Sequence, residues 1–276
     1  MPDPVGVPIP PVAQGTAELM PTGEQHQRQA ARIILAAIGP AGFALAGSGA
    51  IREHGLINRP TDDIDLFAPA RAATGFSDAV NTVIATLGAH GYACEVGRVN
   101  SHFARLLLTT SDGYIFEVDL GLDWRAHDPV SLELGPVLAI EDAVANKVGA
   151  LFSRGEPRDY LDVDAIRESG RFADDQLLAL ATQHDPGFDV TMFAARLRAV
   201  EALVPDDVAE YSISPTDLIA IKRRLLTFEQ DLTGKNRLEP TTTHLAKRVE
   251  PGPKNPRRQP PAPPLHQPNR GLGITP

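Results

Sequence analysis

A glycine–serine turn and a pair of aspartates are the residues of this sequence best suited to phosphate chemistry. The turn reads Gly47-Ser48-Gly49, and Asp63 and Asp65 follow after one short predicted helix. Glycines let the backbone approach a ligand, and N–H groups exposed at the start of a helix bind phosphate oxygens. Taken alone, such a segment is more often only a turn, so its meaning depends on the acids that follow it.

Asp63 and Asp65 are two residues apart at the start of a predicted strand, residues 64–67. A period of two directs both side chains to the same face of a sheet. Adjacent carboxylates repel each other, and a divalent cation offsets that repulsion. Mg²⁺ or Mn²⁺ is expected because hard cations prefer carboxylate oxygens. An aspartate-rich turn that caps the strand is the structural alternative.

Asp119 is the candidate third carboxylate. The segment 114–120 alternates in polarity, which places Asp119 and Glu117 on one face of a predicted strand. If this strand neighbours the strand of Asp63 and Asp65, the three aspartates suit two metal ions, or one metal ion and a general base. Such a site aligns a hydroxyl with the α-phosphate of a nucleoside triphosphate. The alternative is an exposed aspartate at a strand end.

Lys147, Arg154 and Asp159 are candidates from the second half of the chain. Lys147 borders the apolar stripe of a predicted helix, and Arg154 follows two turns later on the same face. Both cations could neutralise triphosphate charge. Asp159, near the start of the next helix, would orient Lys147 or the acceptor hydroxyl. The alternatives are a surface lysine and an aspartate that compensates the helix dipole.

The elements that must position these residues form a mixed series followed by helices only. Helical spacing covers 24–38, 50–54, 76–90, 141–152, a segment starting at Pro157, 174–183, 189–203 and 215–232. Strand patterns cover 64–67, 92–99, 103–110 and 114–120, and a short apolar run at 43–46 enters the glycine turn. This order predicts an α+β fold. The predicted parts are a flexible Pro-rich N-terminus (1–23), an α/β core (24–139), a helical domain that completes the site (140–233) and a basic Pro-rich tail (234–276).

Composition excludes several classes of protein. The 276 residues include one cysteine, Cys94, which excludes a disulfide framework and a multi-cysteine metal centre. The eight histidines are scattered without metal-ligand spacing. No run of about 18 apolar residues is present, so no membrane association is expected. The start of the chain lacks the pattern of a secretory signal, and a cytoplasmic location is expected.

Charge and proline are unevenly distributed. Residues 234–276 contain eight basic and two acidic residues, a net charge of +6, within a total of −9. The remaining residues therefore carry −15. Six of the 25 prolines lie in residues 1–21 and ten in 240–276, and we expect both ends to be disordered. The tail is either a solvated extension or an arm that attracts polyanions.

The motifs together resemble one protein family. The Gly47-Ser48 turn, the Asp63-Ile64-Asp65 pair, Lys147 and the run Arg158-Asp159-Tyr160-Leu161-Asp162 are similar to those of the AbiEii/AbiGii-type nucleotidyltransferase toxins, MenT-type mycobacterial toxins among them. The resemblance covers about residues 33–166. It implies a nucleotidyltransferase-like mixed sheet with a helical C-terminal part. It also implies a cognate antitoxin partner and, from mycobacterial members, addition of nucleotides to the 3′ end of tRNA.

The resemblance also implies roles for individual residues. Asp63 and Asp65 would bind Mg²⁺, with Asp119 as a third metal ligand on superfamily logic. Gly47, Ser48, Lys147 and Arg154 would bind the nucleotide, and Asp159 would complete the catalytic set of Asp63, Asp65, Asp119 and Lys147.

The sequence thus predicts an Mg²⁺-dependent nucleotidyltransferase toxin. It would transfer an NMP from an NTP to an acceptor hydroxyl, with the 3′ end of tRNA as the expected acceptor and a block of translation as the consequence. Two alternatives stay open at this point. One keeps the chemistry but uses a small molecule or a protein hydroxyl as acceptor, which the acidic core favours slightly. The other is a catalytically inactive binding module.

Overall fold

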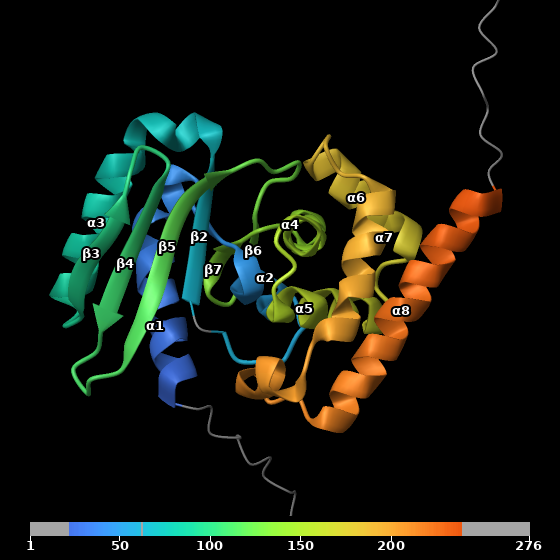
Figure 1. Ribbon diagram of the computed structural model, residues 1–276. Helices are drawn as coiled ribbons and strands as arrows, with labels where there is room; N and C mark the ends of the chain where they lie inside the picture. The colour runs from blue at the N-terminus through green and yellow to red at the C-terminus, as the bar shows by residue number, and fades with distance from the viewer. Residues whose placement is uncertain (1–21, 62, 239–276) are drawn as a thin grey trace, which may run out of the picture. The chain divides into compact units, whose positions relative to one another are not determined.

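The computed structural model describes residues 22–61 and 63–238. Helices and strands alternate in its first part, and helices alone make up the second (Figure 1). The strands are β1 (Ala44–Leu45), β2 (Asp63–Pro69), β3 (Ala93–Val99), β4 (Phe103–Thr109), β5 (Ile115–Asp123), β6 (Val130–Leu132) and β7 (Gly135–Val137). The α-helices are α1 (Thr22–Ile38), α2 (Gly47–Glu53), α3 (Phe76–Ala89), α4 (Ile140–Ser153), α5 (Pro157–Glu168), α6 (Asp174–His184), α7 (Val190–Arg198) and α8 (Pro215–Leu238). Short 3₁₀ segments are η1 (Gly39–Ala41), η2 (Ala70–Gly75), η3 (Ala199–Ala202) and η4 (Pro205–Tyr211).

The strands form one mixed sheet in the order β3-β4-β5-β2-β1-β7-β6. β2 and β5 are parallel neighbours at its centre, and β5 is antiparallel to β4. The pairing of β2 with β5 confirms the adjacency on which the expected convergence of three aspartates depended. This mixed sheet with its helical second part confirms the predicted fold class.

The two faces of the sheet differ in polarity. On β2, Ile64, Leu66 and Ala68 are buried, whereas Asp63 and Asp65 point to the opposite face and are only partly covered. β4 and β5 repeat this alternation, so that the apolar sides of all three strands share one face. Helices α1 and α3 lie against the sheet on that side (Figure 1). The polar face is left open toward α4 and α5.

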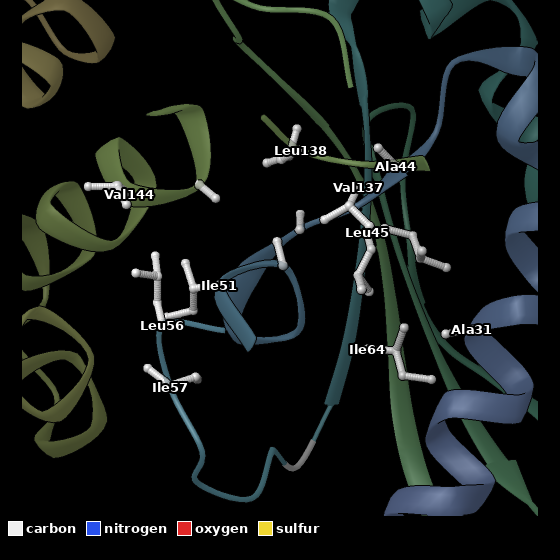
Figure 2. Close-up of a cluster of buried hydrophobic side chains, with 14 of the residues drawn as sticks. Ala31, Ala44, Leu45, Ile51, Leu56, Ile57, Ile64, Val137, Leu138 and Val144 are labelled. Carbon is white, nitrogen blue, oxygen red and sulfur yellow. The ribbon is translucent and has the colours of Figure 1, made fainter. Parts of the chain in front are cut away.

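A second part of the core anchors the helix that follows β1. Leu45, Ile51, Leu138 and Val144 are buried together where β1, α2, β7 and α4 meet (Figure 2). The amide of Leu138 donates to the carbonyl oxygen of Leu45, which holds the start of α4 beside the end of β1. Because α2 begins directly after β1, this packing fixes the glycine–serine segment next to the polar face of the sheet.

Several predicted boundaries differ from the structure. The predicted helix 50–54 begins earlier, at Gly47, so the glycine–serine segment is the first turn of α2 rather than a loop before it. The β6–β7 hairpin was not predicted, because each strand has three residues and Gly135-Pro136 interrupts the pattern. The predicted helix 189–203 divides into α7 and η3.

The predicted terminal segments fall largely outside the described residues. We expected both ends of the chain to be disordered, and residues 1–21 and 239–276 lie outside the described part. The expectation therefore stays a prediction. The helix α8 continues to Leu238, so residues 234–238 extend the helical part rather than begin the tail. The described residues, 22–61 and 63–238, belong to one compact unit. Among the described residues, none of the helices combines the length and apolar character that a bilayer crossing requires.

Candidate active site

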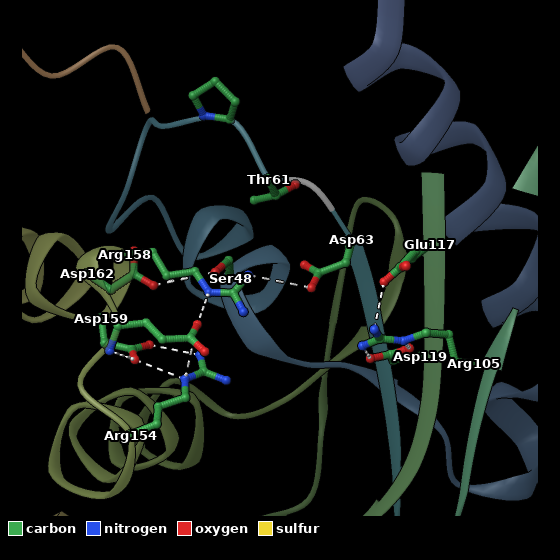
Figure 3. A network of polar contacts seen from close by, with 12 residues as sticks. Ser48, Thr61, Asp63, Arg105, Glu117, Asp119, Arg154, Arg158, Asp159 and Asp162 are labelled. Atoms are coloured by element: carbon green, nitrogen blue, oxygen red, sulfur yellow. Dashed lines mark hydrogen bonds and ion pairs between the residues drawn. The ribbon is translucent and has the colours of Figure 1, made fainter. Parts of the chain in front are cut away.

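Three acidic side chains meet on the polar face of the sheet. In the register of the parallel pair, Asp65 lies opposite Asp119. Asp63 lies opposite Glu117, and both side chains are seen in Figure 3. Asp119 is 6% exposed, and Asp63 and Asp65 are partly buried. The structure therefore places the predicted Asp63, Asp65 and Asp119 on one side of two adjacent strands.

The electrostatic cost of this arrangement is concentrated on Asp65. Desolvation by burial, the largest cause, and the charges of Asp63 and Asp119 together raise the pKa of Asp65 to about 7. Lys147 and Arg158 oppose the increase but do not cancel it. A carboxylate that is destabilised by burial and by like charges is a place where a cation would be stabilised.

Arg105 holds Asp119 in position. Its Nε and Nη2 atoms donate to the two carboxylate oxygens of Asp119 at 2.8 and 2.6 Å, a bidentate pairing. The two residues are directly opposite each other on β4 and β5. Arg105 Nη1 also lies 3.0 Å from Glu117 Oε2. Burial would lower the pKa of the guanidinium, but the bond to Asp119 is the largest effect and raises it, so Arg105 stays charged.

Gly47 is required by the approach of α2 to Asp65. A Cβ atom on Gly47 would lie 1.7 Å from Asp65 Oδ2, and Gly47 has a φ of +56°. The amide of Ala46 donates to the carbonyl oxygen of Asp65, so the backbone before α2 is bonded to β2. The lack of a side chain at Gly47 thus lets the backbone of α2 approach the carboxylate of Asp65. Contact of Gly47 with a phosphate stays a prediction.

Ser48 and Lys147 belong to a buried ionic network on the floor of the site. Lys147 Nζ donates to Ser48 Oγ at 2.7 Å and lies 2.9 Å from Asp162 Oδ2. Arg59 donates from Nε and Nη2 to the two oxygens of Asp162 and from Nη2 to Ser48 Oγ at 2.8 Å. All four side chains are 8% exposed or less. The network contains two cations and one anion, which leaves a positive charge beside Asp65.

Asp162 is the anion that holds this network together. Burial would raise its pKa, but Lys147 and Arg59 outweigh that effect, and the pKa of Asp162 falls below its ordinary value. Asp162 lies on α5, Lys147 on α4 and Ser48 on α2, so the carboxylate links three helices. Ser48 is more enclosed than expected for a residue that contacts a triphosphate.

Asp159 pairs with Arg154 rather than with Lys147. Arg154 Nε and Nη2 donate to the two oxygens of Asp159 at 2.9 and 2.8 Å (Figure 3). Asp159 also accepts from the amide of Glu156, the N-cap residue of α5, and so completes a capping box at the start of this helix. It is fully buried, whereas the side chain of Arg154 is 44% exposed. The orientation of Lys147, expected from Asp159, comes from Asp162.

Arg158 connects the α5 side to the acids of the sheet. Its Nη1 atom lies 3.8 Å from Asp63 Oδ2 (Figure 3). Burial of Arg158 and the nearby Arg154 lower its pKa, and Asp63 and Glu156 raise it; the net change is upward. Arg158 and Arg154 therefore both stay cationic at the border between the carboxylates and α5.

A cleft of about 530 Å³ opens between the sheet and the helical part. The β-strands contribute Asp65, Phe67 and Asp123, and α2 contributes Gly47. From α4 and the residue after it come Lys147 and Arg154. The cleft is large enough for a nucleotide. Of the predicted residues, Gly47, Asp65, Lys147 and Arg154 line it.

The sequence assigned no role to three residues that complete the site, namely two arginines and one aspartate. Arg59 and Asp162 close the network around Lys147, and Arg105 clamps Asp119. Asp162 had a signal, because it lies three residues after Asp159 in the motif and thus close to it on the helix. Arg59 and Arg105 had none, since their partners are 103 and 14 residues away.

The donor set fits a divalent cation at the Asp63 and Asp65 pair. Both offer hard carboxylate oxygens from one face of β2, and Asp65 is destabilised by its neighbours. Within residues 22–61 and 63–238, no group of three or more histidine, cysteine, aspartate or glutamate side chains is spaced to hold a metal ion. Both oxygens of Asp119 are bonded to Arg105, which explains why the expected third ligand does not complete such a group.

Comparison with known proteins gives one family and a set of related folds. The sequence profile of the family described as "Nucleotidyl transferase AbiEii toxin, Type IV TA system" matches residues 31–231. No curated protein sequence matches. The nucleotidyltransferase toxin MenT4 of Mycobacterium tuberculosis has a TM-score of 0.50 and 16% identity, over 78% of this chain and 86% of MenT4. JHP933 of Helicobacter pylori has a TM-score of 0.49 and 18% identity, over 79% and 94% of the two chains.

Proposed function

The chain belongs to the AbiEii family of nucleotidyltransferase toxins, and from that premise we propose that it transfers an NMP from an NTP to the 3′ hydroxyl of tRNA in a reaction that depends on Mg²⁺. The observation that supports this most directly is that Asp65, which lies opposite Asp119 on the neighbouring strand, lines the cleft together with Lys147. Carboxylates and a lysine at one cleft suit a triphosphate and its counter-ion.

The residues of the chain divide the work in this proposal. Lys147 and Arg154 bind the triphosphate from the α4 side of the cleft. Asp63 and Asp65 would hold Mg²⁺, and the ion would supply positive charge for the phosphates and for the acceptor hydroxyl. A site carboxylate accepts the hydroxyl proton, while the new bond forms at the α-phosphorus and the bond to pyrophosphate breaks. Asp119 is the carboxylate we assign to this step, because Arg105 fixes its position.

Ser48 and Asp159 have supporting roles in the proposal. The Ser48 hydroxyl accepts from both Lys147 and Arg59, and so sets the position of the Lys147 ammonium group. Asp159 fixes two of the nitrogen atoms of Arg154 and leaves the third toward solvent or ligand. Fixed cations of this kind stabilise charge that develops on the triphosphate in the transition state.

The proposed acceptor, tRNA, is supported by charge and by family resemblance. Residues 234–276 carry a net charge of +6 in a chain that is otherwise acidic. Such a segment attracts a polyanion, and each phosphate contact contributes to the salt dependence of binding. Transfer to the 3′ end would remove the hydroxyl that carries the amino acid, which would block translation. We also propose a cognate antitoxin as a protein partner, because the family is that of a toxin–antitoxin system.

The test is transfer of label from each of four α-³²P NTPs to total tRNA in the presence of Mg²⁺. We expect label on intact tRNA with at least one NTP and none from the same NTP labelled at the γ-phosphate, because the γ-phosphate leaves with pyrophosphate. tRNA oxidised with periodate, which lacks a free 3′ hydroxyl, is the matched control and should stay unlabelled. Chelation with EDTA should abolish transfer.

Other outcomes separate the proposal from its alternatives. Label on oxidised tRNA would contradict the 3′ end as the acceptor position. Transfer to a small molecule or to a protein, with none to tRNA, would keep the chemistry and refute the acceptor. No transfer to any acceptor from folded protein that binds no NTP would favour a catalytically inactive binding module. Removal of residues 239–276 should weaken tRNA binding and reduce its salt dependence.

A further inference from the structure

One end of the cleft contains polar atoms that the site described above does not use. Among the described residues, only Asp123 Oδ2, Arg125 Nη1 and His184 Nε2 are buried side-chain atoms without a hydrogen-bond partner. Two of them, those of Asp123 and His184, belong to residues that line the cleft together with Lys147 and Asp65. Buried polar atoms are nearly always bonded, so an unpaired pair on two residues that line a ligand-sized cleft indicates groups that a ligand satisfies.

An aromatic surface lies beside these two atoms. Trp124 lines the same cleft and is 49% exposed, and its ring meets the His184 ring edge to face with centroids 5.6 Å apart. The half-exposed indole offers a flat surface, and His184 supports it from the end of α6. Planar bases stack on such surfaces, because every nucleobase has a π face.

The backbone and one arginine hold this end of the cleft in place. Asp123 ends β5, four residues after Asp119, and Arg125 donates from Nε and Nη2 to Asp123 Oδ1 at 3.1 and 2.7 Å. Arg125 Nη2 also donates to the carbonyl oxygen of Phe67 at the end of β2. One carboxylate oxygen of Asp123 is thus anchored, and the other, Oδ2, is buried without a hydrogen-bond partner.

We propose that Asp123, Trp124 and His184 form the nucleobase subsite, with the base stacked on Trp124 and an exocyclic amino group donating to Asp123 Oδ2. This inference rests on the proposed function, since it assigns the part of the NTP that Lys147 and Arg154 do not bind. Adenine, cytosine and guanine carry an amino group that suits a carboxylate. Uracil does not, because its only N–H on the pairing edge lies between two carbonyl oxygens that the carboxylate repels.

The positions of Asp123, Trp124 and His184 relative to Lys147 and Arg154 indicate that the base of the NTP would occupy this end of the cleft. Lys147 and Arg154 line the cleft from α4 and the residue after it, and Asp65 lines it from β2. Asp123 is the last residue of β5, and Trp124 follows it. In Figure 1 the chain that leaves β5 runs toward α6, which carries His184. A ligand that places phosphates at Lys147 therefore extends its other end toward Trp124.

The first experiment uses the fact that Trp124 is the only tryptophan in the chain. Its fluorescence is titrated with ATP, CTP, GTP, UTP and inorganic triphosphate in the presence of Mg²⁺ and without acceptor. We expect saturable quenching by at least one amino-bearing NTP, at least about fivefold weaker binding of UTP, and no saturable quenching by inorganic triphosphate. Titration of free N-acetyltryptophanamide corrects for absorption by the bases.

Asp123→Asn is the matched variant, because it preserves the shape of the side chain and removes its charge. The preference for amino-bearing NTPs over UTP should fall to within about twofold in Asp123→Asn and stay unchanged in Asp78→Asn, at an exposed position on α3. Saturable quenching by inorganic triphosphate equal to that by the NTPs would overturn the subsite. So would wild-type binding of UTP as tight as that of every other NTP, or an unaltered preference in folded Asp123→Asn.

The same titration distinguishes failure of the subsite from failure of the proposed function. Base-dependent quenching in a protein that transfers label to no acceptor would refute the proposed function and leave the subsite standing. Transfer by a protein whose Trp124 fluorescence does not respond to any NTP would refute the subsite and leave the transferase standing.

Discussion

Asp65 and Asp119 lie directly opposite each other on the neighbouring parallel strands β2 and β5. Their side chains share a face with Asp63, and burial together with the neighbouring charges raises the pKa of Asp65 to about 7. The sheet thus holds close together groups that repel each other when no cation is bound. Strain of this kind costs stability and is characteristic of sites where a ligand supplies the missing charge.

Replacement of Gly47 should damage the site through a single methyl group. In Gly47→Ala the new Cβ would overlap Asp65 Oδ2, and the φ of +56° disfavours any side chain. We expect a loss of about 1–3 kcal/mol in the free energy of unfolding and a fall in nucleotidyl transfer. Urea denaturation measures the first, and label transfer the second.

The matched control is Gly88→Ala in α3. Gly88 has no atom within 4 Å of the position of its Cβ, and alanine is the better helix former. We expect Gly88→Ala to stabilise the fold slightly and to leave transfer unchanged. If Gly47→Ala behaved like Gly88→Ala in both assays, the close approach of α2 to Asp65 would be without consequence.

The clamp on Asp119, the carboxylate that we assign to the hydroxyl proton, predicts that Arg105→Lys slows nucleotidyl transfer. Lysine keeps the charge but cannot donate to both oxygens of Asp119 in one plane. Replacement of a group that orients a carboxylate of the site costs about 10–100-fold in activity. The measurement is the rate of label transfer at saturating NTP and Mg²⁺. An unaltered rate in the folded variant would show that Arg105 does not position Asp119 for the reaction.

Asp162→Asn should cause a large loss of stability because it leaves Arg59 and Lys147 buried without their anion. Breaking a buried ion pair by removal of one partner costs about 3–5 kcal/mol. The pKa of Asp162 is lowered in the folded protein, so its contribution is complete above the pKa of the unfolded chain, about 4. The contribution is lost as the pH falls through the lower folded pKa.

The difference in the free energy of unfolding between wild type and Asp162→Asn is therefore expected to be constant from pH 7 to about pH 5 and to shrink below about pH 4. Urea denaturation at several pH values measures it. Asp206→Asn, at an exposed position, should differ little from wild type at any pH. A difference that grew as the pH fell would contradict the lowered pKa of Asp162.

Local pattern was enough to predict the strands β2 to β5 and the acids that β2 and β5 carry. The alternation on 114–120 places Asp119 on the polar face, and the spacing of Asp63 and Asp65 does the same on β2. Period-two patterns report which side of a sheet is buried, and that is a local property. The family and the fold class followed from these motifs, and both are confirmed.

The ion pairs could not be predicted, because they depend on which distant segments meet. Lys147 has no local reason to choose Asp162 over Asp159, since the two acids are one helical turn apart. The choice depends on how α5 packs on α4 and where Arg59 enters. The β6–β7 hairpin was missed for a different reason: strands of three residues are too short to show a period.

The central claim is that the carboxylates on β2 and β5 carry the transfer of a nucleotide, and the most direct test compares Asp65→Asn, Asp119→Asn and Asp78→Asn in transfer of α-³²P label. The account predicts a loss of at least about 100-fold for the first two, with full activity for Asp78→Asn, which lies on α3 away from the cleft. It also predicts that Asp65→Asn unfolds at the same or a higher urea concentration than wild type, because the substitution removes a repelled charge. Wild-type transfer by folded Asp65→Asn would contradict the account.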